Sequence, residues 1–225
     1  MNAENLKSYE IYALGDSAIT IEFGKYINPE TNDLVISRFN QFQENPIKGV
    51  LDLIPSYHSL TLCYDLNVVA KQKSGLHSLI DQVKSRLEEP IELHTHSTQL
   101  HEVPVVYGGK NGSDLCRVSQ EKGIDLQEII RLHAEPTYRV YMLGFIPGFA
   151  YLGELNSKLT MPRKSAPQPM VPGSIGIAGL QTGIYPSFSP GGWNIIGHTD
   201  YPLLENGIPI LQAGDRVKFI PLNQL

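Results

Sequence analysis

Residues 141–152 read YMLGFIPGFAYL, a run in which aromatic and aliphatic side chains alternate with glycine and proline. This mixture continues toward the C-terminus, because residues 144–214 hold 12 of the 20 glycines and 9 of the 16 prolines. Short strand-like pieces lie between the turn residues, at 138–145, 174–178, 193–197, 208–211 and 216–220. Many short strands separated by frequent turns favour a closed or nearly closed β barrel over parallel βαβ units.

The chain before residue 91 has a different pattern, in which strands and helices alternate. Strands are predicted at 9–14, 18–23, 50–54 and 59–64, and helices at 28–45 and 75–89. Asn28-Pro29-Glu30 is a helix start, with a capping side chain, proline at the first helical position and an acid in the first turn. The order strand, strand, helix occurs twice, which favours a small α+β sandwich with its helices on one sheet face.

An extended stretch at residues 91–107 separates the two patterns, and we place a domain boundary within it. The fold class is therefore predicted as α+β, with an α/β domain at residues 1–92 and a β-barrel domain at residues 93–225. Two short helices, at 114–121 and from Asp125 to Glu135, are predicted as an insert before most of the barrel strands.

Composition argues against several functional classes. With 18 basic and 23 acidic residues, the 225-residue chain has a formal charge of −5, so general electrostatics do not favour nucleic-acid binding. Residues 165–199 hold no Asp, Glu, Lys or Arg, but their prolines and glycines would break a membrane-spanning helix. Residues 1–10 show no signal-peptide pattern, and two cysteines are too few for a disulfide framework. We therefore expect a cytoplasmic protein that binds neither nucleic acid nor membrane.

Standard cofactor and metal motifs are mostly absent from the sequence. Gly173, Gly176 and Gly179 have the spacing of neither a phosphate loop nor a dinucleotide fingerprint, so we expect no standard ATP site in this chain. His94 and His96 would share one face of a strand and could bind a metal together. Because no cysteine or carboxylate stands at ligand spacing, we interpret both as solvent-facing histidines and predict no metal site.

Candidate ligand-binding residues gather in the glycine- and proline-rich region. The run 141–152 is either a packed strand and turn or the wall of a pocket, since glycine lets the backbone approach a ligand. Arg163 and Lys164 belong either to a solvated loop or to an anchor for a carboxylate or phosphate. The other candidates belong either to turns and the core or to a small-molecule site on the barrel: Gln181, Thr182, Tyr185 and Trp193.

Several segments together resemble one known family. The matching segments are 102–109, 114–115, 123–124, 128–133, 141–152, 161–163, 171–179, 181–186 and 189–197. They are similar to the allophanate hydrolase subunit 1 family, also called the KipI family, and the match spans nearly the whole chain. The resemblance implies an α/β N-terminal domain followed by a cyclophilin-like β barrel.

The resemblance also implies that the chain functions as one subunit of a protein complex. It suggests a non-autonomous subunit of an ATP-dependent 5-oxoprolinase, which converts 5-oxo-L-proline to L-glutamate. ATP is then required by the complex, and no motif assigns it to this chain. One implied partner is a second cyclophilin-like protein (subunit 2, of the KipA type), which is the C subunit of 5-oxoprolinase. The other is a barrel-type protein, the A subunit of 5-oxoprolinase.

Within such a complex the candidate residues receive roles. We expect Arg163 and Lys164 to contact an anion and Trp193 to form an apolar wall. Polar side chains that orient the substrate are expected at three positions: Gln181, Thr182 and Tyr185. His133 is a candidate acid/base group, and the alternative is a packed helix residue.

Two other functions stay open. The family includes an inhibitor of a sporulation histidine kinase, and the uncharged stretch 165–199 would also suit a docking surface. A carboxyltransferase-type subunit that acts on a urea-like amide would need a separate biotin carboxylase and carrier. His198 stands where many relatives have arginine, and this difference puts the substrate, not the fold, in doubt.

Overall fold

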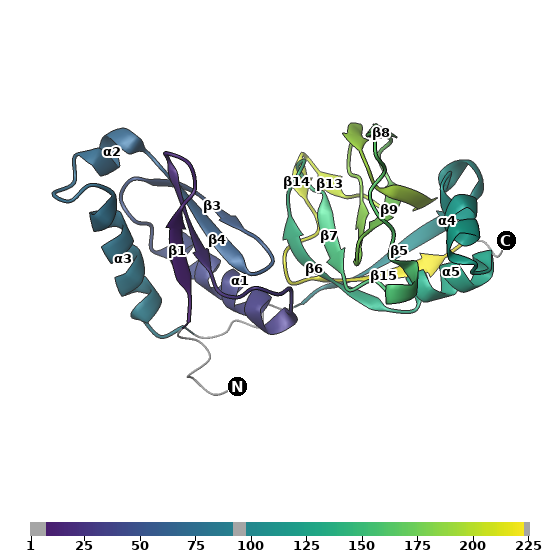
Figure 1. Ribbon diagram of the computed structural model, residues 1–225, viewed down its shortest axis with the longest axis horizontal. Coiled ribbons are helices and arrows are strands. Elements are labelled where there is room, and N and C mark those ends of the chain that lie inside the picture. The colour runs from purple at the N-terminus through teal and green to yellow at the C-terminus, as the bar shows by residue number, and fades with distance from the viewer. Residues whose placement is uncertain (1–7, 92–97, 223–225) are drawn as a thin grey trace. The chain divides into compact units, whose positions relative to one another are not determined.

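The structure is a computed structural model that describes residues 8–91 and 98–222. It divides into two compact units, Met1–His96 and Ser97–Leu225 (Figure 1). The predicted boundary between residues 92 and 93 lies outside the described residues. In the described parts of the chain, no helix is long and apolar enough to cross a membrane.

The first unit is a four-stranded antiparallel sheet with helices against one face. The strand order is β1 (Glu10–Ala13), β2 (Ala18–Glu22), β4 (Ser59–Tyr64) and β3 (Val50–Pro55). The helices are α1 (Pro29–Glu44), α2 (Leu66–Ala70) and α3 (Leu76–Glu88). The sequence pattern does not predict α2, but every other element of this unit lies within one residue of its predicted bounds.

Local capping and strand alternation explain this unit. The Asn28 side chain accepts a hydrogen bond from the Thr31 N–H at 2.7 Å, and Pro29 is the first residue of α1. Alternate residues of β2 and β4 point toward the helices and are fully buried. With residues of α1 and α3 they form the core of the unit: Ile19, Ile21, Leu60, Leu62, Phe42, Leu79 and Val83.

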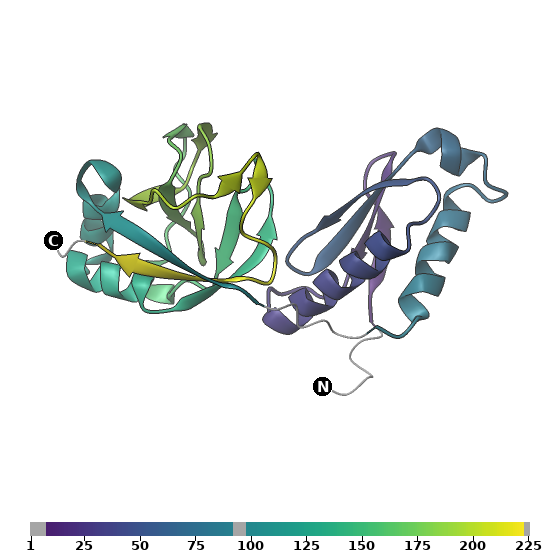
Figure 2. The same cartoon turned by 180° about the vertical axis from the view of Figure 1, so that it is seen from behind.

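The second unit is built on a closed barrel of seven strands. Around the barrel the order is β10 (Gln181–Ile184), β7 (Ala150–Gly153), β6 (Thr137–Leu143), β15 (Arg216–Pro221), β5 (Leu100–Tyr107), β12 (Asn194–His198) and β9 (Ser174–Ala178). Neighbouring strands are antiparallel except β15 and β5, which run parallel side by side (Figure 2). The predicted fold class, α+β with a β barrel, is confirmed.

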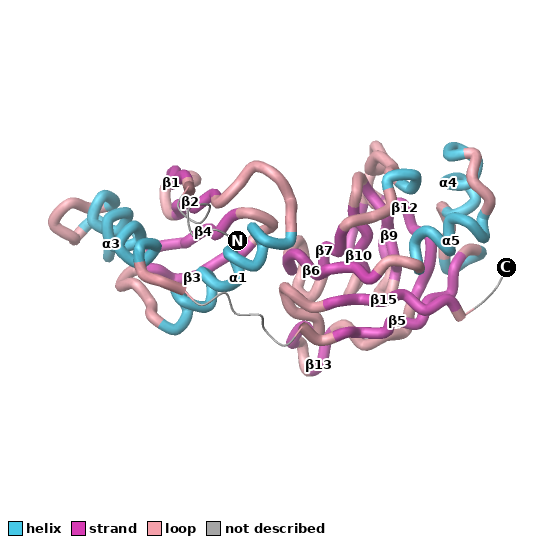
Figure 3. Tube along the Cα trace, turned by 90° about the horizontal axis from the view of Figure 1, so that it is seen from below, coloured by secondary structure: helices cyan, strands magenta, loops and turns pink. Residues whose placement is uncertain are grey.

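Shorter elements surround the barrel. Helices α4 (Leu115–Lys122) and α5 (Leu126–Ala134) lie at one end of it and contribute residues to its core (Figure 3). Two small ribbons add to the barrel: β8 (Gln168–Met170) with β11 (Ser189–Gly191), and β13 (Leu204–Glu205) with β14 (Ile208–Pro209). Single turns of 3₁₀ helix occupy Gly109–Asn111 and Ser157–Leu159.

Strand β10 corrects the interpretation of residues 181–184, which the sequence pattern places in loops. These residues pair with both β9 and β7 and so belong to the barrel wall. Because strand residues alternate between faces, Thr182 and Ile184 point into the barrel, whereas Gln181 and Gly183 lie on its outer face. The burial of Thr182 and Ile184 agrees, since both are fully buried. Gln181 and Thr182 therefore point to opposite faces of the strand.

Candidate functional site

An apolar cluster separate from the barrel core lies on the outer face of β9 and β10. It includes Phe149, Tyr185 and Trp193, with Tyr151 packed against it. A Cβ atom on Gly183 would lie only 2.9 Å from the Phe149 ring and 3.1 Å from the Trp193 ring. The glycine in the middle of β10 therefore leaves the room in which these aromatic rings lie against the strand.

The aromatic rings of this cluster hold one another in fixed orientations. The centroid of Phe149 lies 4.8 Å from Tyr151, 4.9 Å from Tyr185 and 5.4 Å from Trp193, and all three contacts are edge-to-face. This geometry matches the quadrupoles of aromatic rings, so the cluster forms a rigid wall.

A cavity of about 410 Å³ opens beside this wall. The residues that line it include Phe149, Tyr151, Arg163, Lys164, Tyr185 and Trp193. Four of the six binding residues that the sequence predicts thus meet at one pocket: Arg163, Lys164, Tyr185 and Trp193. An apolar cleft with a few convergent polar groups is the usual form of a small-molecule site.

The two pocket tyrosines are hydrogen-bond donors at neutral pH. Burial raises the pKa of Tyr151 and of Tyr185, although the charge of Arg163 opposes this shift in both. The Trp193 backbone N–H also hydrogen-bonds to the Tyr185 hydroxyl. Both phenols therefore keep their protons, and together with Arg163 they make the polar side of the pocket electropositive.

The two cations of the pocket differ in their partners. The Lys164 ammonium lies 2.6 Å from Asp114 Oδ2, so its charge is already paired. Arg163 is exposed, and within the described parts of the chain its guanidinium has no hydrogen bond or ion pair. Arg163 is therefore the group of this pocket that is open to a carboxylate or phosphate.

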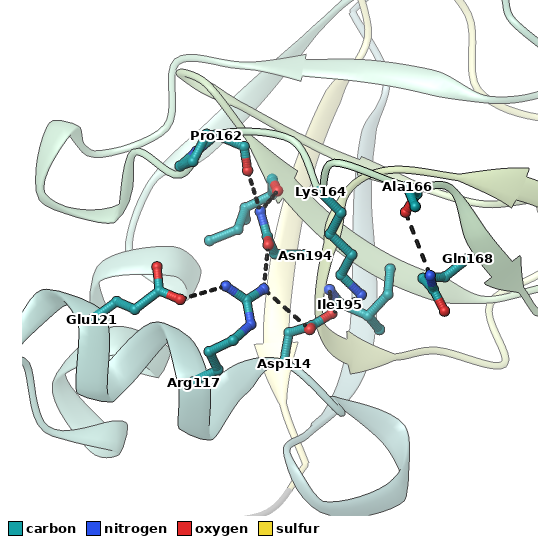
Figure 4. A network of polar contacts seen from close by, with 10 residues as sticks. Asp114, Arg117, Glu121, Pro162, Lys164, Ala166, Gln168, Asn194 and Ile195 are labelled. Atoms are coloured by element: carbon teal, nitrogen blue, oxygen red, sulfur yellow. Dashed lines mark hydrogen bonds and ion pairs between the residues drawn. The ribbon is translucent and has the colours of Figure 1, made fainter.

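A polar network that the sequence does not predict lies behind Lys164 (Figure 4). Arg117 donates to Asp114 at 3.2 Å, to Asn194 Oδ1 at 2.5 Å and to Glu121 at 2.7 Å. Asn194 is buried and donates to the carbonyl oxygens of Pro162 and Ile177, each at 3.0 Å. The network ties α4 and β12 to the segment that carries Arg163.

The remaining predicted site residues do not line this pocket. Thr182 and His133 are fully buried inside the barrel, where His133 Nε2 lies 2.8 Å from the Thr182 hydroxyl. Gln181 lies on the outer face of β10 but outside the cavity lining. His198 Nε2 donates to the Pro172 carbonyl at 2.9 Å and also lies outside the lining.

The described residues offer little to a metal ion. No group of three or more His, Cys, Asp or Glu side chains among them could hold one. His94 and His96 lie outside the described residues. Cys63 and Cys116 are both free thiols, and Cys116 is exposed.

Comparison with known proteins gives a consistent set of relatives. The family model of the carboxyltransferase domain, subdomain C and D, matches residues 9–207. A curated Bacillus subtilis protein, named as the B subunit of 5-oxoprolinase, is 42% identical over 96% of this chain and 94% of its own length. The Escherichia coli O157:H7 protein of the same name is 35% identical, over 93% of this chain and 94% of its own length.

Solved structures include the same fold. The crystal structure of TTHA0988 superposes on 92% of this chain with a TM-score of 0.76 and 32% sequence identity. This chain spans only 40% of the length of that solved chain.

Proposed function

This chain belongs to the family of carboxyltransferase domains, subdomains C and D, and we propose that it is one subunit of a 5-oxoprolinase complex. The family resemblance stated from the motifs is confirmed by the relatives. The observation that carries the proposal is the exposed Arg163 guanidinium beside a rigid aromatic pocket.

The chemistry of this pocket suits 5-oxo-L-proline. That molecule is a nearly flat five-membered lactam ring that carries one carboxylate. A guanidinium binds a carboxylate through two parallel hydrogen bonds, and Arg163 has its donors free for this contact. The lactam ring would then lie against Phe149 and Trp193, and the hydroxyls of Tyr151 and Tyr185 would donate to its oxygen atoms.

We propose that this pocket is not the ATP site of the complex. A triphosphate needs several cations or a bound metal ion, whereas Lys164 is already paired with the carboxylate of Asp114. A lactam amide is stable, so its hydrolysis at neutral pH needs activation of the carbonyl. We therefore propose that the complex uses ATP and binds it on one of the other proteins.

We also propose that the other subunits of the complex supply the general acid and base. Burial lowers the pKa of His133 to about 3, and its ring is sealed inside the barrel away from the pocket. The chain thus binds and orients the substrate, and the partners proposed from the family, the C and A subunits, supply the reacting groups. This division agrees with a protein that is inactive alone.

Reconstitution tests the proposal. We would measure 5-oxo-L-proline-dependent ATP hydrolysis and glutamate formation with this chain alone, with each partner, and with both partners. Glutamate formed only in the full mixture is the expected result. An assembled complex that forms no glutamate contradicts the proposal, and kinase inhibition or a urea-like amide substrate would then be the functions to assay.

A further inference from the structure

Asp114 occupies a helix-capping position but does not cap. It directly precedes α4, where an aspartate normally accepts a hydrogen bond from the first turn, yet its side chain makes no such bond. Instead, Asp114 Oδ2 accepts from the Ile195 N–H at 2.7 Å and from the Lys164 ammonium at 2.6 Å (Figure 4). The Asp114 backbone N–H donates back to the Ile195 carbonyl at 2.8 Å. The carboxylate is therefore committed to joining β12 and Lys164.

Lys164 in turn fixes the backbone next to Arg163. The Lys164 N–H donates to the Gly192 carbonyl at 2.7 Å, and its ammonium is held by Asp114. On the other side of Arg163, the Pro162 carbonyl accepts from Asn194 at 3.0 Å. Both neighbours of Arg163 are thus anchored, while the Arg163 side chain itself has no such contact in the described parts of the chain.

The charges of the network balance without Arg163. Burial would raise the pKa of Asp114, but hydrogen bonds from Lys164, the Ile195 N–H and Arg117 together bring it below its ordinary value. Asp114 is therefore ionised at neutral pH and neutralises Lys164, while Glu121 pairs with Arg117. Arg163 remains as the uncompensated cation at the pocket.

We propose that Asp114 is a positioning residue for Arg163. By holding Lys164, it fixes the segment 162–164 so that the Arg163 guanidinium stands at the pocket, and it directs a bound anion to Arg163 by neutralising Lys164. This inference rests on the proposed function in one respect, that the pocket binds a carboxylate. Asp114 itself does not line the cavity.

The role of Asp114 can be tested through the fluorescence of Trp193. It is the single tryptophan of the chain and lies in the pocket wall, so its fluorescence reports ligand binding by the full chain without any partner. The titrants are 5-oxo-L-proline, the neutral lactam 2-pyrrolidinone, and acetate. The variants are Asp114→Asn, which keeps an acceptor for the Ile195 N–H, Arg163→Gln, and the double variant.

We expect the variants to lose affinity for ligands that carry a carboxylate and to keep their affinity for the neutral lactam. Asp114→Asn should raise the Kd of 5-oxo-L-proline about fivefold to tenfold and leave that of 2-pyrrolidinone within about twofold. In the Arg163→Gln background the same change should add less than about twofold, because the residue it acts through is gone. Glu128→Gln, which breaks an exposed ion pair with Arg131 outside this network, is the matched control and should bind as the unaltered chain does.

Other outcomes overturn the assignment. It is wrong if Asp114→Asn binds 5-oxo-L-proline normally, or if its effect is equally large without Arg163. If Asp114→Asn does not fold, Lys164→Met breaks the same pair from the other side and should give the same selective loss. Binding of acetate but not of 5-oxo-L-proline contradicts the proposed substrate, and the cycle is then completed with acetate. No response to either carboxylate overturns the role of Asp114, whereas the proposed function still stands or falls by reconstitution.

Discussion

The barrel interior and the outer pocket both place polar groups among aromatic rings, but only the interior closes its hydrogen bonds within the chain. His133 lies between the Tyr107 hydroxyl, at 2.6 Å from Nδ1, and the Thr182 hydroxyl, at 2.8 Å from Nε2. Its ring stacks on Phe219 at a centroid distance of 4.6 Å. In the pocket, by contrast, Arg163 is exposed and has no hydrogen-bond partner among the described residues.

The hydrogen bonds inside the barrel also determine the tautomer of His133. The Thr182 hydroxyl donates to the Gly176 carbonyl at 3.1 Å, so it must accept from His133 Nε2–H. His133 Nδ1 is then unprotonated and accepts from the Tyr107 hydroxyl. Donors that are satisfied in this way stabilise the fold, whereas a donor that faces a cavity remains available to a ligand. The partners of a residue, rather than its type, separate the two roles.

The largest expected effect is on stability, from His133→Ala. The change removes a fully buried ring and its hydrogen bonds to the hydroxyls of Tyr107 and Thr182, so the free energy of unfolding should fall by about 3–5 kcal/mol. Urea denaturation of the full chain measures it. His77→Ala, at an exposed position of α3, is the control and should change stability by less than about 0.5 kcal/mol. A loss below about 1 kcal/mol for His133→Ala would contradict the closed network.

The stability of the protein should also depend on pH through His133. Burial lowers its folded-state pKa from 6.5 to about 3, so on acidification the unfolded chain takes up a proton before the folded chain does. The stability contributed by neutral His133 is complete above pH 6.5 and is lost as the pH falls from 6.5 toward 3. Between pH 7 and pH 5 this loss should be about 2 kcal/mol, and it should be absent in His133→Gln. Parallel stability curves for the two proteins would refute the assignment.

Arg163→Gln should have the opposite profile, with lost binding and unchanged stability. Removing a charged bidentate contact should raise the Kd of 5-oxo-L-proline about 30-fold, while the exposed position should keep the free energy of unfolding within about 0.5 kcal/mol. Trp193 fluorescence and urea denaturation measure the two quantities. Arg131→Gln, on the exposed surface of α5, is the matched control. If Arg163→Gln binds 5-oxo-L-proline normally, Arg163 is not the residue that binds the carboxylate.

The smallest effect is expected from Tyr185→Phe. This change removes one donor from the pocket but keeps the ring against Phe149, so the Kd should rise only about threefold. Tyr26→Phe, at a residue that is 80% exposed, should leave the Kd unaltered. A loss as large as that of Arg163→Gln would mean that the hydroxyl, rather than the guanidinium, dominates recognition.

Local signals explain which parts of the fold the sequence predicts. The cap at Asn28 and the alternation in β9 lie within a few neighbouring residues, so α1 and β9 can be predicted from short windows. Strands β7 and β10 are only four residues long and contain glycine, and their pairing with each other and with β6 and β9 makes them strands. Assigning 181–184 to a strand would also have placed Thr182 inside the barrel.

The residues of the site also differ in whether local sequence signals predict them. Arg163, Tyr185 and Trp193 can be chosen by residue type within a turn-rich region, and they meet at the pocket. Asp114 carries no comparable signal, because its partners Lys164 and Ile195 are distant in sequence and only the closed barrel brings them together.

The parallel pairing of β15 with β5 has a consequence for biosynthesis. β5 is the first barrel strand to be made and β15 is the last, and their register joins residues 100–105 to 216–221. Phe219, which covers His133, arrives only with that last strand. While the ribosome is still adding residues beyond β12, the nascent barrel therefore has an open seam and an uncovered interior. Contacts that span so much of the chain form slowly, so the nascent chain exposes apolar barrel residues until β15 emerges.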